Sequence, residues 1–231
     1  MGEMFENMAK TRKLSGDNPP EFLLTHPITS SRVSDAFNAA ERIEFSGGKK
    51  NTINFEFIKG RLKTRYYSSS PQAAARYFKN LYLESPSNEN KYAYISALKA
   101  NGEAEEAIKL INEMLEKFPK NLILNITKSE IFLYEQRLDD ALKDINKVLN
   151  ISPKNYPASI IKSKILSAQK ETIKAEEILR DLLINKNRDP SLWLQLSEVQ
   201  RAGKNIIGYH LSRGEYLMLL GDFDNALNQF K

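Results

Sequence analysis

Histidine is the residue type that proteins most often use as a metal ligand or catalytic base, and this chain of 231 residues has two, His26 and His210. They lie far apart in the sequence, and the chain contains no cysteine. A catalytic zinc site takes three protein ligands, and most nucleophile–base pairs also use histidine. We therefore expect no self-contained active site of either kind. The lack of cysteine excludes thiol catalysis, thiolate metal sites and disulfides.

The surroundings of His26 predict a stiff loop rather than a helix, because three prolines lie close to it: Pro19, Pro20 and Pro27. Proline inside a helix removes a hydrogen bond and clashes with the preceding turn. From the residues alone, His26 is a loop histidine with local hydrogen bonds, since one histidine specifies no metal site. Serine and threonine at 29–31 then offer an N-cap for a helix over 32–44. His210 has no partner at motif spacing, and we expect it to be structural.

Charge and hydropathy argue against a nucleic-acid-binding surface and against a membrane-spanning helix. The chain carries 34 Lys and Arg against 29 Asp and Glu, a formal net charge of +5. The lysines are scattered among acids and not clustered with aromatic residues, which indicates a solvated helical surface and not a nucleic-acid interface. No apolar run approaches the ~20 residues that span a bilayer.

A repeat of 34 residues organises most of the chain. Ala107, Ala141 and Ala175 are spaced by that distance, and so are the prolines and asparagines that follow the first two. Apolar residues between these points recur with helical periodicity, so each unit predicts two helices. The predicted pairs are 90–100 with 104–118, 122–136 with 138–149, and 157–169 with 173–184.

This 34-residue helix–turn–helix unit, with a small alanine in its second helix and a proline at its end, resembles the tetratricopeptide repeat (TPR). Trp193 begins a fourth unit, where we expect it to pack rather than to bind. The next alanine in phase is Ala226, 51 residues after Ala175. The fourth unit is therefore expected to leave the period, with a helix over 206–220 shared between two units. The last half-repeat would leave an apolar face open, which suggests a truncated array.

The repeat pattern also extends backwards. Segments 53–66 and 72–83 predict a degenerate helical pair, which gives a repeat domain over 51–231. Gly47 and Gly48 precede it and predict a flexible joint. Residues 1–46, with a further predicted helix over 1–14, do not fit the repeat and form a separate region.

Segment 22–27, Phe-Leu-Leu-Thr-His-Pro, followed by Arg32 and Val33, resembles the Thr-His-Pro segment of the HtpX-like zinc metallopeptidases. In the BepA-like subgroup of this family, TPR units directly follow that segment. The resemblance implies that residues 1–46 are the C-terminal remnant of a peptidase domain, and that the fold is all-α, a TPR-type α-solenoid behind this helical remnant. It also implies zinc in the intact parent protein, endopeptidase chemistry and a periplasmic location.

The chain departs from this family at the catalytic centre, because no His-Glu-x-x-His motif occurs in it. Zinc hydrolysis needs the ion and a carboxylate that takes a proton from water, so the chain alone is expected to bind no zinc and to be inactive. By resemblance, His26 would face the zinc cleft as an outer or exchangeable ligand, and Arg32 would bind a substrate backbone or an acidic peptidase residue. The alternatives are a loop histidine and a surface charge.

The TPR resemblance further implies a concave face lined by the first helix of each pair. Lysine and tyrosine there suit peptide carboxylates and extended segments. Together with the metallopeptidase resemblance, this implies that the chain is the substrate- and partner-binding region of an envelope protease in outer-membrane protein quality control. Its partners would be unfolded or assembling proteins, peptides and, as a candidate, the outer-membrane assembly machinery. The alternative is a non-enzymatic TPR scaffold. The candidate partner-binding residues are Tyr92, Ser96, Lys99, Glu130, Tyr134 and Lys164.

Overall fold

The computed structural model describes residues 30–42, 52–67 and 70–230. These residues form twelve helices, α2 to α13, and no strand, so the all-α prediction is confirmed for this part of the chain. The chain divides into two compact units, 1–50 and 51–231. In the first unit the described element is α2 (Ser30–Glu41), where the N-cap signal predicted a helix. His26 and the predicted helix over 1–14 lie outside the described residues.

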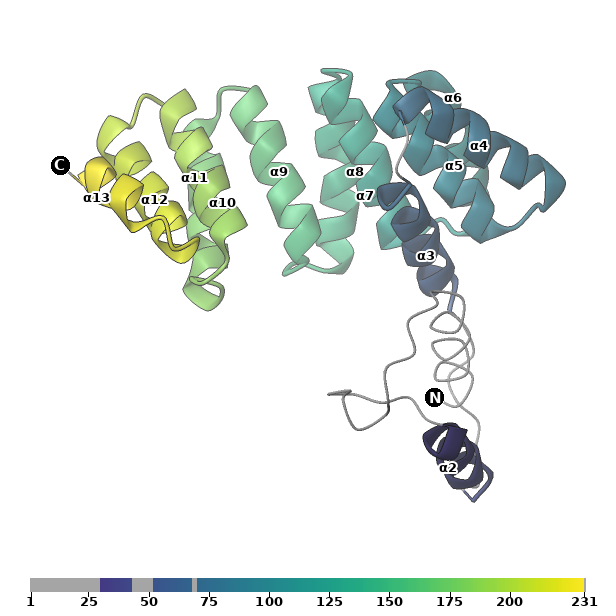
Figure 1. Cartoon of the computed structure of the whole chain (residues 1–231). Helices are drawn as coiled ribbons and strands as arrows, with labels where there is room; N and C mark the ends of the chain where they lie inside the picture. The colour runs from purple at the N-terminus through teal and green to yellow at the C-terminus, as the bar shows by residue number, and fades with distance from the viewer. Residues whose placement is uncertain (1–29, 43–51, 68–69, 231) are drawn as a thin grey trace. The chain divides into compact units, whose positions relative to one another are not determined.

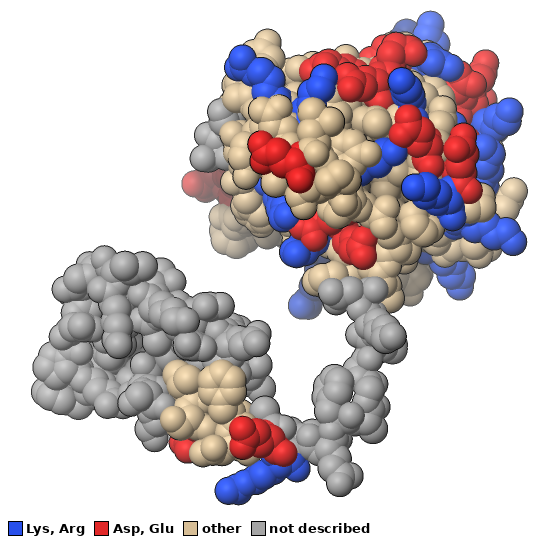
Figure 2. Space-filling model, turned by 90° about the vertical axis from the view of Figure 1, so that its right-hand side faces the viewer, with Lys and Arg blue, Asp and Glu red and all other residues tan. Residues whose placement is uncertain are grey.

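The second unit is a row of helices (Figure 1), and its surface mixes both signs of charge (Figure 2). In the described parts of the chain, no helix is long and apolar enough to cross a membrane. The row begins with α3 (Ile53–Arg65) and α4 (Pro71–Glu84) and ends with α13 (Phe223–Phe230). Between them lie four pairs: α5 (Asn88–Asn101) with α6 (Ala104–Lys117), α7 (Leu122–Tyr134) with α8 (Leu138–Ile151), α9 (Tyr156–Ala168) with α10 (Thr172–Asn185), and α11 (Pro190–Ala202) with α12 (Ile206–Leu219).

The first helix of every pair starts at a capping side chain, and the caps recur every 34 residues. The Asn121 side chain accepts a hydrogen bond from the backbone N–H of Leu124, and Asn155 does the same for Ala158. Such a bond satisfies one of the N–H groups that a helix start leaves unpaired. Local sequence therefore fixes where each pair begins. The full set of caps is Ser87, Asn121, Asn155 and Asp189.

The turn inside each pair has the same period and the same unusual backbone. Gly102 has φ of 79°, and the next three turns place Gln136 at 58°, Lys170 at 66° and Lys204 at 58°. Only glycine adopts this left-handed conformation without a steric penalty. The repeat thus demands a left-handed residue at this point even where the sequence supplies a side chain.

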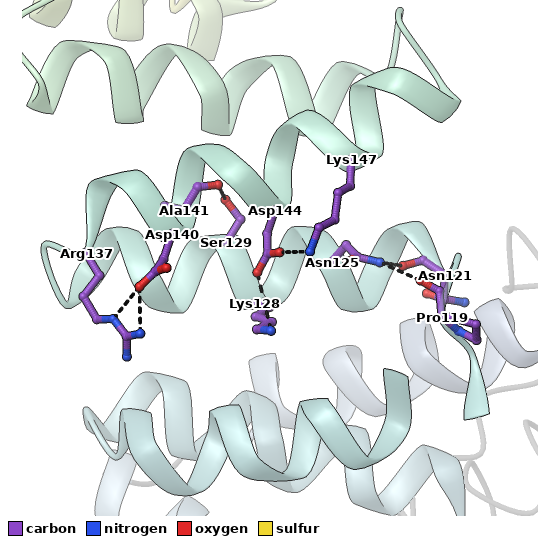
Figure 3. Close-up of polar contacts among 10 residues, drawn as sticks. All are labelled: Pro119, Asn121, Asn125, Lys128, Ser129, Arg137, Asp140, Ala141, Asp144 and Lys147. Atoms are coloured by element: carbon purple, nitrogen blue, oxygen red, sulfur yellow. Dashed lines mark hydrogen bonds and ion pairs between the residues drawn. The ribbon is translucent and has the colours of Figure 1, made fainter. Parts of the chain in front are cut away.

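Small residues allow the two helices of a pair to approach closely. Ala107, Ala141 and Ala175 are all fully buried, as their spacing predicted. In the second pair, the buried hydroxyl of Ser129 on α7 donates a hydrogen bond of 2.8 Å to the backbone oxygen of Ala141 on α8 (Figure 3). A larger side chain at either position would force the helices apart.

The same pair buries one carboxylate, which cations neutralise from both helices (Figure 3). Asp144 on α8 is 3% exposed and lies 2.5 Å from the ammonium of Lys147 and 3.6 Å from that of Lys128 on α7. A buried charge is tolerated when it is paired in this way. Asp144 therefore contributes to the contact between the two helices.

The hydrophobic core runs from α3 to α11 as three successive clusters, each shared by neighbouring pairs. Leu179 and Leu196 lie fully buried in the last cluster, and Trp193 packs against it while its indole N–H donates to the backbone oxygen of Asn187 at 2.7 Å. The packing role expected for Trp193 agrees with this position. No pair has a core of its own, so each helix pair depends on its neighbours.

The fourth pair confirms the predicted change of phase. Helix α12 is the second helix of the pair with α11 and also the first helix of a pair with α13, because the left-handed Gly221 and the buried Ala226 follow α12 just as Gly102 and Ala107 follow α5. The alanine marker is missing because Gly208 takes over the close approach. A Cβ on Gly208 would lie 2.7 Å from the Nε2 atom of Gln200 on α11.

The helical pair predicted over 53–66 and 72–83 is not packed as a pair in the structure. Helices α3 and α4 both form close to their predicted bounds, but both pack mainly against α5 and not on each other. They are therefore not a degenerate repeat unit. The position of α3 matters for the candidate binding surface.

Candidate protein-binding surface

The first helices of the pairs form one side of the row. Helix α9 contacts both α7 and α11, whereas neighbouring second helices in the described chain make no comparable contacts. A row that packs more closely on one side curves toward that side. The first helices therefore line the concave side, as the repeat resemblance implied. We call the surface formed by α5, α7, α9 and α11 the inner face.

At the start of the row, α3 covers the inner face of α5. The ring of Phe57 on α3 is fully buried and stacks on Tyr92 of α5 with ring centroids 5.1 Å apart. Gly60 makes the close approach possible, because a Cβ there would lie 2.5 Å from the backbone oxygen of Glu89. Tyr92 is consequently 0% exposed. The prediction that Tyr92 lines an open concave surface is wrong, since α3 occupies the space above it.

Polar contacts tie α3 to two successive first helices. The Arg61 guanidinium donates to the hydroxyl of Tyr92 at 2.8 Å and to that of Thr127 on α7 at 3.1 Å. The two hydroxyls lie 2.7 Å from each other. At the other end of α3, the side chain of Asn54 accepts a hydrogen bond of 2.8 Å from Asn121, the cap of α7. Helix α3 thus bridges the first two repeats.

An acidic residue of α5 adds an electrostatic contact to α3. Glu89 pairs with Lys63 and, at 3.0 Å, with Lys59. Burial raises the pKa of the Glu89 carboxyl, but hydrogen bonds and charge from Lys63 and Lys59 lower it by more, so the pKa lies below its ordinary value. The ionised carboxylate therefore favours the docked position of α3.

Three of the predicted binding residues are half-buried and already engaged. Lys99 on α5 and Glu130 on α7 form an ion pair of 2.5 Å that joins the two helices. The Ser96 hydroxyl donates to the backbone oxygen of Tyr92 at 2.9 Å. These side chains brace the inner face between α5 and α7. A partner could reach them only by exchanging these contacts for its own.

The other two predicted residues are accessible. Tyr134, at the end of α7, is 74% exposed. Lys164 on α9 is exposed and forms no ion pair with the residues that the structure describes. Lys164 lies on the wall of an open cleft between α9 and α11. The cleft is lined by Lys164, Ser167, Ser191, Leu194, Gln195, Glu198 and Val199.

One glutamine holds the two sides of this cleft together. The Gln195 amide on α11 donates to the Ser163 hydroxyl at 2.6 Å and to the Ile160 backbone oxygen at 3.1 Å, both on α9. Half-buried Leu194 supplies apolar surface, and Lys164 supplies an unneutralised cation. This set can accept an extended segment that carries an apolar side chain and an acidic group.

Sequence reasoning missed the residues that connect neighbouring first helices. Thr127 and Gln195 occupy the same repeat position, 68 residues apart, and each hydrogen-bonds to the preceding first helix. Their shared register was a signal that could have been read. Arg61 was also missed, although the interior glycine next to it, Gly60, is a sign of close helix approach.

The resemblance to the metallopeptidases assigned His26 and Arg32 to a zinc centre. His26 lies outside the described residues, and Arg32 is an exposed residue of α2. His210 Nδ1 lies 3.0 Å from the side-chain oxygen of Gln229, a local contact between α12 and α13. The described ranges contain no group of three or more His, Cys, Asp or Glu that could hold a metal ion.

No protein-family model matches the chain. Among solved structures, it is similar to TTC0263, a thermophilic TPR protein of Thermus thermophilus, with a TM-score of 0.60 and 20% identity over 75% of this chain and 99% of that one. A TPR protein from Parabacteroides merdae has a TM-score of 0.54 and 16% identity over 99% and 90% of the two chains. MamA from Desulfovibrio magneticus RS-1 has a TM-score of 0.52 and 15% identity over 75% and 98%. The fold is therefore a TPR-type α-solenoid.

Proposed function

We propose that this chain is a protein-binding scaffold that holds an extended segment of a partner in the cleft between α9 and α11. The observation that supports this proposal is the composition of the cleft. It combines an exposed cation without an ion pair among the described residues, serine hydroxyls and apolar surface on the inner face, where a curved array offers the largest concave contact.

The neighbouring parts of the inner face are less suited to binding. At α5 the surface is covered by Phe57 and Gly60 of α3, and between α5 and α7 the side chains of Lys99 and Glu130 neutralise each other. Displacing these contacts would oppose binding, because a buried partner group left unpaired costs free energy. The partner segment would therefore lie on the later repeats.

Selection of peptides from a random display library on the purified chain tests the proposal. We expect the selected peptides to share an apolar residue and an acidic group, and Leu194→Asp and Lys164→Glu to weaken their binding about tenfold or more. Ile184→Asp is the matched control, because Ile184 is 76% exposed on α10, away from the cleft. Equal loss with the control, or no loss with the cleft variants, would contradict the proposal.

The resemblance of segment 22–27 and of Arg32–Val33 to the HtpX-like metallopeptidases supports a narrower version. In it, the scaffold is the substrate- and partner-binding region of a periplasmic zinc endopeptidase, and its clients are unfolded or assembling envelope proteins. His26 and Arg32 would then lie beside the catalytic cleft of the intact parent protein, and zinc would be held by that parent's own motif. The alternative remains a scaffold without any enzyme.

Sequencing the DNA ahead of the codon for Met1 separates the two versions. An in-frame His-Glu-x-x-His run is expected if the scaffold belongs to a peptidase. A stop codon in frame, without that run, would leave the scaffold function and remove the peptidase. The peptide-selection result does not depend on this outcome.

A further inference from the structure

Helix α3 is apolar on two opposite faces. One face, with Phe57 and Gly60, is buried against α5. At 100° per residue, Phe55, Ile58 and Leu62 fall together on the opposite face. These three side chains are 51%, 50% and 47% exposed, and Tyr66, which caps the helix on the same side, is 78% exposed. We call these four residues the α3 stripe.

A stripe of this kind is the pattern of a helix that packs on both sides. Surface helices of globular proteins normally carry one apolar face and one polar face. Large apolar side chains at positions i, i+3 and i+7 are the anchors with which one helix packs against an apolar surface of another protein. The α3 stripe is not part of the packing against the array, since Phe57, Gly60 and Arg61 contact α5 and α7 from the other side of α3 and Lys59 reaches Glu89 from the flank.

Positive charge surrounds the α3 stripe. Residues 52–67, which contain α3, include four Lys and Arg and one Glu, a net charge of +3. On the helix, Lys59 flanks the stripe on one side and Arg65 on the other, and both are exposed. Cations beside an apolar seam select partners that carry acidic residues at the matching flanks.

We propose that the α3 stripe is a second protein-binding surface, and that its partner is an acidic amphipathic helix of another protein. The apolar seam of that helix would pack on Phe55, Ile58 and Leu62. Its carboxylates on one flank would pair with Arg65, and those on the other flank would share Lys59 with Glu89. This surface lies on the opposite side of α3 from the inner face. A partner could therefore occupy it while a client segment occupies the cleft between α9 and α11.

An anionic membrane is a less suitable partner. Membrane recruitment by charge uses clusters of four to eight freely available cations. Around α3 most cations are already engaged: Lys59 and Lys63 pair with Glu89, and Arg61 binds Tyr92 and Thr127. The regular spacing of the stripe also suits a ridged helix surface better than a fluid one.

Fluorescence anisotropy with a designed peptide tests the proposal on the whole chain. The probe is an amphipathic helix of about four heptads with leucine in the seam and glutamate at the flanks. A second probe has lysine in place of every glutamate. We expect the acidic probe to bind at least about tenfold more tightly than the basic probe, and its affinity to fall as salt is added.

Two kinds of variant distinguish specific binding at the α3 stripe from non-specific hydrophobic binding. Ile58→Glu and Leu62→Glu should each lower the affinity for the acidic probe by about tenfold or more. Ile184→Glu, at another exposed isoleucine, should leave that affinity unchanged. Arg65→Glu keeps the apolar stripe and should shift preference toward the basic probe. Circular dichroism confirms that each variant keeps its helix content and melting temperature.

Several results would overturn the proposal. Equal binding of both probes, or equal effects of stripe and control variants, would remove the stripe as a specific site. Sedimentation with phosphatidylserine vesicles but no peptide binding would assign the stripe to membranes. A photo-crosslinker at position 58 that reacts only within residues 1–50 of the same chain would show that the stripe is covered internally. Dimers that Ile58→Glu abolishes would assign it to a second copy.

Discussion

The two ends of the inner face are built from the same repeat and yet differ in what they can bind. At α9 and α11, the first helices leave a cleft with Lys164 and Leu194 accessible. At α5, the corresponding surface is filled by α3, and Tyr92 is fully buried. The repeat therefore provides the scaffold, whereas one helix outside the repeat decides which part of the scaffold remains open.

We expect the largest loss of stability from a variant that prevents the close approach of the two helices of a pair, since both ends of the array depend on that approach. Ala141→Arg places a charged side chain at a fully buried position between α7 and α8. We expect the free energy of unfolding to fall by more than about 3 kcal/mol, because the site has neither space nor a partner for the charge. Asn150→Arg, on the exposed side of α8, is the control for urea denaturation. An unchanged transition for Ala141→Arg would show that the repeat register is wrong.

The second variant, Gly60→Ala, affects only the end of the inner face that α3 covers, which we call the covered end. In a typical helix, Gly→Ala stabilises by roughly 0.5–1 kcal/mol. At Gly60 the sign should reverse, because the new Cβ would lie 2.5 Å from the backbone oxygen of Glu89. We expect a loss of about 1–3 kcal/mol and increased protease cleavage near α3. A gain in melting temperature would mean that α3 does not pack on α5 in solution.

Substitutions in the left-handed turns should change the free energy of unfolding by a smaller amount, and by the same amount at both ends of the array. Lys170→Gly should raise the free energy of unfolding by roughly 0.5–1 kcal/mol, because it removes the steric penalty of φ near 66°. Gly102→Lys in the first turn should lower it by a similar amount. Thermal melts of the two variants, measured side by side, test the pair. Shifts of the same sign would contradict the shared turn geometry.

The smallest effect is electrostatic and again belongs to the covered end. Because the pKa of Glu89 is lowered in the folded chain, its contribution is complete above the ordinary glutamate pKa and is lost as the pH falls through the folded value. We expect Glu89→Gln to lower the free energy of unfolding by about 0.5 kcal/mol near neutral pH, a small amount because solvent and salt screen the ion pair. Well below the folded pKa of Glu89 the substitution should have no effect. Urea titrations at neutral and strongly acidic pH measure this difference. A constant cost across the range would rule out the ion pair as its cause.

Sequence reasoning was successful wherever the determinant was local and repeated. The alanines at 107, 141 and 175 and the prolines and asparagines that follow the first two recur with the period of one unit, so their spacing alone located the pairs. The change of phase was also predicted correctly, from the 51 residues between Ala175 and Ala226, but the spacing did not reveal that Gly208 takes the place of alanine in the α11–α12 pair. A small residue is the physical requirement there, and alanine is one way to meet it.

The candidate site was harder to predict, since exposure on the inner face depends on contacts far along the chain. Tyr92 and Lys164 lie on first helices of the same repeat type, and the sequence offered no local reason to treat them differently. What separates them is α3, which begins some 35 residues before α5 and reaches α7 through Arg61. The resemblance-based roles of His26 and Arg32 remain predictions.

The bridge that α3 makes between α5 and α7 also sets the direction in which the array should open. At that end, fraying of the first pair requires loss of the Arg61, Asn54 and Glu89 contacts together. At the other end, α13 packs mainly on α12. Amide hydrogens of α13 should therefore exchange with deuterium first, followed by α12 and α11, while those of α5 exchange late. The solenoid would unzip from its C-terminal end, so its cleft region would become accessible to chaperones and proteases before its covered end.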